Sequence, residues 1–437
     1  MLMLSLIICI AILLSIFIGF KLRINTGLVA IPFAYVIGCF FLKLKPAEVI
    51  SMWPISIFFV ILTVSLFFTF AVVNGTLEVL SQKLLYGCRT FPILLPLAIF
   101  FISALIAALG AGYYSVMVLM APVALIICKK IEIHPLVGAL CADCGAQVGS
   151  NFMISLNGVI YRKLIIGEGF SDSKAFTTSI SIFFTYLVMT FMIITLLILY
   201  YKRKRVSFQE NASIELKKPE QFNQKQKTNL YLILIFVIVL LVPPILHFIV
   251  PKNANIAFLN SNLDVGLIST IFIVIASFLK LADSKEVLTK VPWNTLVMIS
   301  GVGMLVAVAI KAGTVNILAH WVGGNIPVFF VPIVLTIVAA VITSFGSFIG
   351  IVAPALFPVV SSISHLTGLN PTMLYTCITV GGLSAGISPF SAGGAIVLGF
   401  TAEKERDDMM KKELFVGLPL CIGASVLVSI IYFFIFH

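Results

Sequence analysis

The sequence predicts an all-α polytopic membrane protein built from two related halves. Of its 437 residues, 60% are hydrophobic and 10% are charged, and the mean hydropathy is +1.16. Apolar stretches of about 20 residues recur along the whole chain, and each is long enough to cross a hydrocarbon core of about 30 Å as a helix. Soluble globular domains are far less apolar, so the soluble classes are excluded.

The apolar stretches form two series in the same order. The first series is predicted at 3–20, 25–42, 53–74, 91–128, 134–160 and 177–201, and the second at 230–250, 263–282, 294–312, 326–363, 371–400 and 415–436. The polar stretch 202–229 separates them and predicts a solvated cytoplasmic linker. We therefore expect an N-terminal transmembrane repeat over 1–201 and a C-terminal one over 230–437.

Matching glycines and prolines support this repeat. In each half a Gly is followed by a Pro 12 residues later and by another Pro 13 residues after that: Gly110, Pro122 and Pro135, then Gly346, Pro358 and Pro371. A Gly-Thr pair also follows the third span of each half, at Gly75 and Gly313. Transporter folds are commonly built from such repeats, so the shared order predicts internal duplication.

The stretches 91–128 and 326–363 are about twice as long as one crossing needs. Each is either two full spans or a re-entrant hairpin with a Gly-rich tip. Lys83 and Arg89 precede the first of them, and Lys129 and Lys130 follow it. Because basic residues flank this stretch on both sides, both of its ends are predicted to lie in the cytoplasm, which favours a hairpin. Each repeat then has five crossings plus one hairpin, and the odd number of crossings inverts the second repeat.

The basic residues agree with this topology. With the N-terminus outside, 21 of the 28 Lys and Arg residues fall inside and 7 outside, as the positive-inside rule requires. This bias explains most of the net charge of +11 without a nucleic-acid partner. We expect an integral multi-pass protein of a bacterial cell membrane, surrounded by the lipid bilayer, with both termini outside.

Four predicted breaks in helices combine Gly with polar side chains, at 109–115, 144–151, 344–348 and 381–394. A broken helix exposes N–H groups that suit a carboxylate and C=O groups that suit a cation such as Na+. The alternative is that these glycines only allow close helix packing. The candidate substrate-binding residues are Gly110, Ala111, Gly112, Tyr113, Ser115, Gly346, Ser347, Phe348, Ser388, Pro389 and Ser391. The candidate coupling-ion residues are Asp143, Gly145, Gln147, Gly149, Ser150, Asn151 and Gly386.

Asp143 lies inside an apolar stretch, where a charge is expensive enough that a function is the default hypothesis. It would carry a coupling proton or help to hold a cation; the alternatives are a structural pairing or a helix-end position near water. The five His residues show no metal-ligand spacing, and no zinc, nucleophile-elbow or nucleotide-binding motif occurs. The sequence therefore predicts no enzyme, no cofactor and no metal other than a coupling Na+.

The stretch from Gly27 to Gly38, the segment Ala108 to Pro122, and Gly145 to Ser150 resemble the dicarboxylate carriers of the MatC type, within the ion transporter superfamily of divalent anion/Na+ symporters. At the two tips, Gly110-Ala-Gly112 and Gly346-Ser-Phe348 stand where that superfamily typically has Ser-Asn-Thr. The resemblance implies two inverted repeats, a homodimer and an elevator-like movement. The implied substrate is a small anion such as malonate or a C4-dicarboxylate, coupled to Na+ or H+.

Other functions stay open at this point. Within transport, the alternatives are a cation/proton antiporter, which a required Asp143 would favour, or an inorganic anion exporter of the same superfamily. Outside it, the alternatives are a channel or a membrane-embedded enzyme. Saturable uptake that depends on an ion gradient separates a carrier from these last two classes.

Overall fold

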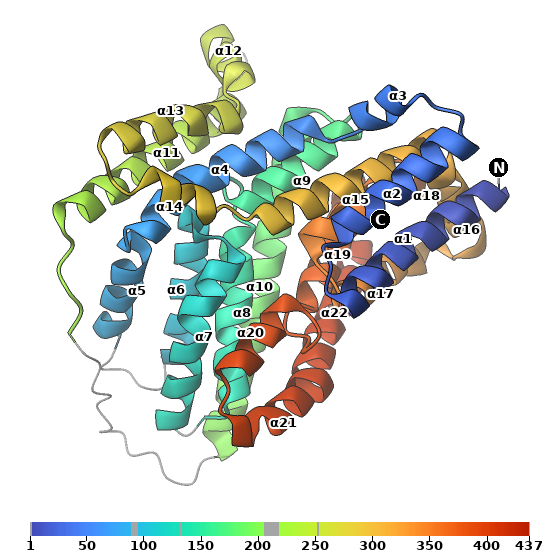
Figure 1. The fold of residues 1–437 in the computed structure, drawn as a ribbon. Coiled ribbons are helices and arrows are strands. Elements are labelled where there is room, and N and C mark those ends of the chain that lie inside the picture. Colours follow the sequence, from blue (N-terminus) through green and yellow to red (C-terminus); the bar gives the residue numbers. More distant parts are fainter. Residues whose placement is uncertain (1, 89–94, 132, 205–217, 251–252, 437) are drawn as a thin grey trace.

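The computed structural model describes residues 2–88, 95–131, 133–204, 218–250 and 253–436. These residues form helices and their connections, and no strand occurs among them (Figure 1). The predicted all-α class is therefore confirmed. Of the predicted linker, 205–217 lie outside the described residues, as do 91–94 at the start of the first long stretch.

The described residues of the first half form ten α-helices and two π-helical segments. They are α1 (Leu2–Leu22), α2 (Thr26–Val36), η1 (Ile37–Phe41), α3 (Pro46–Ser51), α4 (Ile55–Val73), α5 (Thr76–Gly87), α6 (Leu95–Ile106), η3 (Ala107–Ala111), α7 (Tyr113–Lys130), α8 (Pro135–Ser150), α9 (Leu156–Gly167) and α10 (Asp172–Lys204).

The described part of the second half follows the same order with small additions. Its helices are α11 (Gln224–Ile249), α12 (Ala254–Asn262), α13 (Val265–Phe278), α14 (Ser284–Thr289), α15 (Trp293–Lys311), α16 (Thr314–Asn325), η4 (Val328–Phe330), α17 (Val331–Thr343), η5 (Phe348–Val352), α18 (Ala353–Thr367), α19 (Pro371–Ser384), α20 (Ala392–Phe400), α21 (Glu403–Lys412), η6 (Glu413–Gly417) and α22 (Leu418–Phe436).

Local backbone geometry recurs at corresponding points of the two halves. Pro54 precedes α4 and Pro292 precedes α15, both with φ −76°. Gly75 then starts α5 at φ 74°, and Gly313 starts α16 at φ 77°. Such positive φ angles favour glycine, so the Gly-Thr pairs of the sequence mark the same sharp corner twice.

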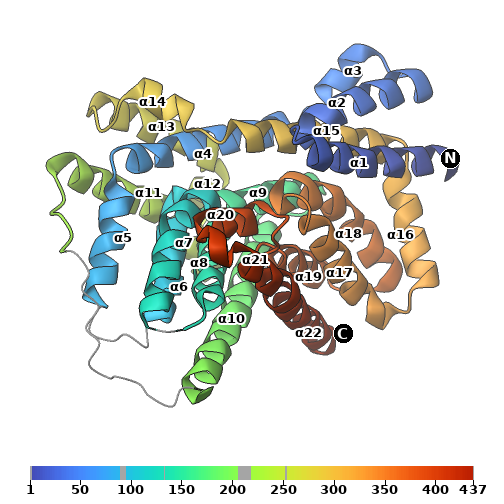
Figure 2. The same ribbon diagram turned by 60° about the horizontal axis from the view of Figure 1, so that its bottom comes forward.

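Two layers of helices make up the molecule. Figure 2 shows an upper layer of α1–α4, α11 and α13–α15 above a lower layer of α6–α10 and α17–α22, with α5 and α16 descending on opposite sides. In the upper layer α15 packs against α2, and α13 packs against α4, so each half contributes one helix to each pair. In the lower layer α6 and α7 pack on α8, as α17 and α18 pack on α19.

Seven described helices are long and apolar enough to cross a membrane, by length and composition: they include α4, α7, α10, α11 and α15, together with the continuous helices 348–367 and 403–436. Five shorter apolar helices accompany them: 3–19, 26–41, 95–111, 265–278 and 328–343. This pattern agrees with an integral membrane protein. How deep each helix lies in the membrane, and which side each terminus faces, stay predictions.

The helices differ from the predicted spans at some ends. Helix α11 starts at Gln224, six residues before the predicted span, because Asn223 and Gln226 form a reciprocal capping box at its N-terminus. Helix α10 starts five residues early, at Asp172. The short helices α3, α5, α14, α16 and α21 were not predicted, because they are short or polar.

The two long stretches fold as helix, break and helix. In the first, the chain changes direction at Gly110 (φ 97°) and Gly112 (φ 72°), and α6 and α7 lie side by side (Figure 2). A Cβ atom at Gly110 would overlap the ring of Phe68 on α4, so only glycine fits there. The second stretch breaks between Thr343 and Phe348, the end of α17 and the start of η5.

The contact between α2 and α15 predicts a stability effect. A Cβ atom at Gly301 would lie 2.7 Å from the Gly27 Cα, closer than real Cβ contacts allow. Gly301→Ala should therefore push the two helices apart and destabilise the protein by about 1–3 kcal/mol. A lower thermal midpoint in detergent would show this. Gly423→Ala on α22 is the matched control, since nothing lies within 4 Å of its added methyl; equal midpoints would contradict the packing role.

Candidate functional site

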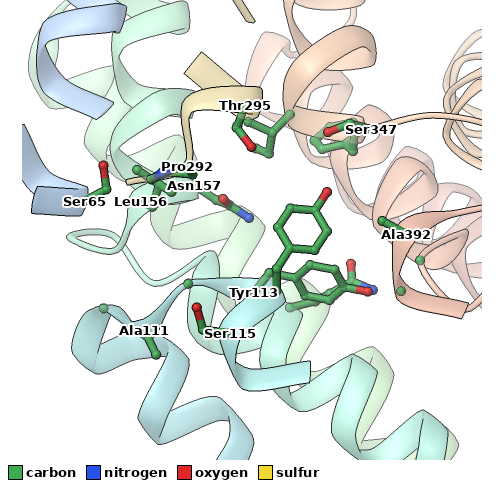
Figure 3. A pocket seen from close by; sticks show the side chains of 18 of the residues that line it. Ser65, Ala111, Tyr113, Ser115, Leu156, Asn157, Pro292, Thr295, Ser347 and Ala392 are labelled. Atoms are coloured by element: carbon green, nitrogen blue, oxygen red, sulfur yellow. The ribbon is translucent and has the colours of Figure 1, made fainter. Parts of the chain in front are cut away.

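A cavity of about 200 Å³ lies between the two layers, where the helix breaks of both halves meet. Its lower-layer wall comes from the breaks around Gly110, Gly346 and Gly386, and its upper-layer wall from α4 and the start of α15. Figure 3 shows Tyr113 projecting into the centre, with Thr295 and Ser347 beyond it and Ala392 to one side. The breaks of the two halves therefore build one common site.

Five described helices begin at the wall of this cavity. They are α7 at Tyr113, α9 at Leu156, α15 at Trp293, η5 at Phe348 and α20 at Ala392, and residues of the first turn of each line the cavity. The first N–H groups of a helix have no partner within the helix, and its N-terminus carries about half a positive charge. Five such ends around one small space favour an anion.

Side chains add polar groups to these backbone groups. Ser65 and Thr69 line the cavity from α4, Asn157 from the first turn of α9, and Thr295 from α15. Lys290, which follows α14, is the one charged side chain among the described lining residues, and it is exposed. Among the described lining residues, the cavity therefore has one cationic side chain, at its accessible edge, and no anionic one.

Asp143 lies directly behind this lining. Its side chain is 2% exposed; the Tyr113 hydroxyl donates to Asp143 Oδ1 at 2.6 Å, and Gln147 Nε2 donates to Oδ2 at 2.9 Å. Tyr113 and Gln147 themselves line the cavity. None of the ion pairs between described residues involves Asp143. A buried carboxylate is thus linked to the cavity through two hydrogen bonds and has no basic partner among the residues that the structure describes.

The structure brings many of the predicted residues together at the cavity. Those that line it are Gly110, Ala111, Gly112, Tyr113, Ser115, Gln147, Gly346, Ser347, Phe348, Gly386 and Ser391. At two of the breaks, hydroxyls cap the following helix: Ser347 Oγ accepts from Gly350 N at 3.1 Å, and Ser391 Oγ accepts from Gly394 N at 3.4 Å. These two serine side chains therefore help to form the breaks, because each caps the helix that follows it.

Other predicted residues lie behind the lining. Gly145 and Gly149 face α6, where an added Cβ would meet the backbone of Phe100 and of Ala104, so their absent side chains permit close helix packing. Asn151 Oδ1 accepts from the Tyr161 hydroxyl at 2.8 Å.

The last three predicted residues, Ser150, Ser388 and Pro389, also lie outside the cavity lining. Ser150 Oγ is buried with no hydrogen-bond partner among the described residues. Ser388 Oγ donates to the Ser344 carbonyl at 2.9 Å and thereby ties the α19–α20 break to the end of α17; Pro389 follows it in the same break.

Sequence reasoning missed the lining residues of the upper layer and Asn157. Ser65 and Thr69 are one helical turn apart in a mostly apolar span, a polar stripe that could have been noticed. No pattern in the sequence distinguishes Lys290 as a site residue, because a basic residue at its position is also expected of an ordinary loop between two spans. Within the described residues no three His, Cys, Asp or Glu side chains gather where they could hold a metal ion.

Comparison with known proteins agrees with this architecture. A family model described as the dicarboxylate carrier protein MatC N-terminus matches residues 2–150 and 229–387. Each matched stretch starts near the first helix of its half and ends at the break after α8 or α19. No curated protein sequence matches the chain.

Two solved transporters share the fold. The YdaH transporter of Alcanivorax borkumensis, described as having an unusual topology, superimposes with a TM-score of 0.55 at 16% identity over 86% of this chain and 85% of that one. MtrF of Neisseria gonorrhoeae, described with a class of antimetabolite efflux pumps, gives 0.57 at 14% identity over 86% and 81%. Because the family model covers well over half of the residues, the chain belongs to the MatC dicarboxylate carrier family and is a membrane transporter, not an enzyme.

Proposed function

We propose that the protein is a secondary active transporter of a small dicarboxylate, such as malonate or a C4 acid, and that it couples uptake to protons through Asp143. The observation that carries this proposal is the convergence of five helix N-termini and Lys290 on one small cavity. The family name supports a dicarboxylate. A cavity of about 200 Å³ suits a small acid better than a drug-sized molecule.

Proton coupling follows from the position of Asp143. An ionised Asp143 repels a dianion in the cavity, and water screens this repulsion little because the carboxylate is buried. Protonation removes the repulsion. It also weakens the bond from Tyr113, whose hydroxyl then can donate to the substrate. Binding of the proton and binding of the anion therefore favour each other, as symport requires.

The two layers support an alternating-access movement. The cavity lies between them, so a displacement of the lower layer against the upper one would change which side can reach the substrate. Gly75 and Gly313 provide sharp corners at the starts of α5 and α16, the two helices that flank the lower layer. An elevator-like mechanism, inverted repeats and a homodimer are part of this proposal.

The basic test is uptake by proteoliposomes. We expect saturable accumulation of labelled malonate, malate or succinate driven by an inward proton gradient. Parallel vesicles with a Na+ gradient or no gradient separate the coupling ions, and preloaded vesicles test efflux. If none of the three acids moves under any gradient, the dicarboxylate assignment is wrong; if only Na+ drives uptake, the role of Asp143 in proton coupling is wrong.

Asp143→Asn should separate binding from coupling. The amide is neutral at every pH, so we expect substrate exchange between the two sides to continue but to lose its pH dependence. Net accumulation driven by a proton gradient should be lost. In the wild type, uptake should rise as the pH falls, because protonation of Asp143 removes the repulsion. A variant that retains the wild-type pH profile would exclude Asp143 from coupling.

Lys290→Gln should weaken binding of the dianion. Loss of a partly exposed charge interaction of about 1 kcal/mol raises the KM about fivefold. The difference between wild type and variant should shrink at high salt, because salt screens exposed charges. Lys285→Gln, on the short helix α14 that Lys290 directly follows but outside the cavity lining, is the matched control. Equal effects of both substitutions would show that only the general surface charge matters.

A further inference from the structure

Two glycines at the α19–α20 break lie directly against the hydrogen bonds of Asp143. A Cβ atom added to Gly386 would lie 2.1 Å from Gln147 Nε2 and 3.2 Å from Asp143 Oδ1. A Cβ atom added to Gly393 would lie 1.9 Å from the Tyr113 hydroxyl oxygen and 3.1 Å from Asp143 Oδ1. Real Cβ atoms do not approach other atoms as closely as 2.1 Å. Both hydrogen-bond donors of Asp143 therefore occupy space that a side chain at these glycines would need.

These contacts join the two halves of the protein. Asp143 and Gln147 belong to α8, and Tyr113 starts α7, all in the first half. Gly386 lies in the break after α19, and Gly393 lies in the first turn of α20, which packs against α7. The carboxylate of the first half is thus held, with its two donors, against a break of the second half.

Ser391 fixes the position of Gly386 within that break. Its hydroxyl donates to the Gly386 carbonyl at 2.6 Å and accepts from Gly394 N at 3.4 Å, at the start of α20. Ser391 and Gly386 both line the cavity. An anion at the N-terminus of α20 would therefore touch Ser391, and a change there would reach the amide of Gln147 through Gly386.

Few other ionisable groups face Asp143. Of the neighbouring elements, α6, η3 and α20 carry no ionisable side chain. The ionisable side chains that act on Asp143 are Tyr113 on α7, Cys144 on α8, Tyr186 on α10 and Glu413 in η6. Ion pairs involving α9 and α21 join other residues: Arg162 to Asp172, Lys163 to Asp264, Lys129 to Glu405, and His134 to Asp408. Stabilisation of the charged carboxylate thus depends on its two hydrogen-bond donors.

We propose that Gly386 and Gly393 are positioning residues for proton coupling: they leave room for Gln147 and Tyr113 to bond to Asp143, and the break transmits anion binding to this carboxyl group. Hydrogen bonds to a carboxylate favour its ionised form. A shift of the break that withdraws one donor therefore favours protonation of Asp143. This inference rests on the proposed function and adds the contact through which the anion and the proton affect each other.

Gly386→Ala is the selective test. Its methyl group would overlap only the side-chain amide of Gln147, a flexible group that can turn away from Asp143. At Gly393 an added methyl would also lie 2.5 Å from the backbone oxygen of Gly386, so that substitution is less selective. In proteoliposomes, the pH midpoint of labelled malonate uptake should rise by about one unit in Gly386→Ala, because the ionised carboxylate has lost one donor.

A double-mutant cycle shows whether the effect passes through Gln147. Gln147→Ala removes the same donor and should shift the midpoint equally, and adding Gly386→Ala to it should shift the midpoint no further. Gly399→Ala, also on α20, is the matched control because nothing lies within 4 Å of its added methyl. It should keep the wild-type profile. A further shift in the double variant would overturn the inference.

Infrared spectroscopy gives a readout that needs no transport. The difference between spectra with and without Asp143→Asn isolates the carboxyl band of Asp143. That band should persist to a higher pH in Gly386→Ala, and an unchanged band would overturn the inference. If Gly386→Ala does not fold, the double variant decides: it lacks the overlapping amide, so it should fold and match Gln147→Ala, and misfolding would count against the contact. A shifted band without any uptake by the wild type would instead contradict the proposed function.

Discussion

The structure depends on one constraint: backbone N–H and C=O groups that leave a helix inside a membrane need partners. Four interruptions, at 107–112, 151–155, 344–347 and 385–391, lie within the protein between packed helices. Residues at these interruptions form bonds that replace the missing helical ones. Ser155 Oγ donates to the Ala108 carbonyl at 2.9 Å, and Ser388 Oγ donates to that of Ser344 at 2.9 Å. Residues of the first turns of the helices that follow these interruptions line the cavity, so the same constraint supports the proposed anion site.

The sequence predicted the fold well where hydrophobicity alone determines it. The long apolar helices α4, α7 and α15 lie close to their predicted ranges, since a membrane leaves the chain few alternatives. The short helices α5 and α16 were missed because only their glycine corners, Gly75 and Gly313, mark them. Helix α11 begins early because its polar first turn is fixed by a capping box and by a bond from Gln226 Nε2 to the Asn74 carbonyl at 3.0 Å, a tertiary contact that no local pattern shows.

The candidate site was half predictable for a related reason. Breaks in helices can be recognised in a sequence by glycine and serine within apolar stretches, so Gly110, Tyr113, Ser347 and Gly386 could be selected from the sequence. The opposite wall is assembled by packing of the upper layer on the lower one, between segments that are far apart in the sequence.

Hydrogen bonds between the helices of the lower layer bear on how the substrate is held. In the lower layer, hydroxyls join separate helices: Thr336 Oγ1 lies 2.6 Å from Ser429 Oγ, and Thr178 Oγ1 lies 3.1 Å from Thr372 Oγ1. Such bonds between helices favour movement of the lower layer as a unit. Helix N-termini of α7, α9 and α20 belong to that unit and would stay with the anion throughout.

The upper layer contributes contacts of another kind. Lys290 and the hydroxyls of Ser65, Thr69 and Thr295 touch the cavity from helices that do not belong to the lower unit. In the proposed movement these contacts are made on one side only, whereas the helix dipoles and Asp143 travel with the substrate. Under this proposal a neutralised Asp143 would keep the anion bound during the crossing, and loss of the Lys290 contact would make release on the far side easier. In the proposed mechanism, the lower layer would then provide affinity for the anion, and the upper layer would determine on which side of the membrane the anion is released.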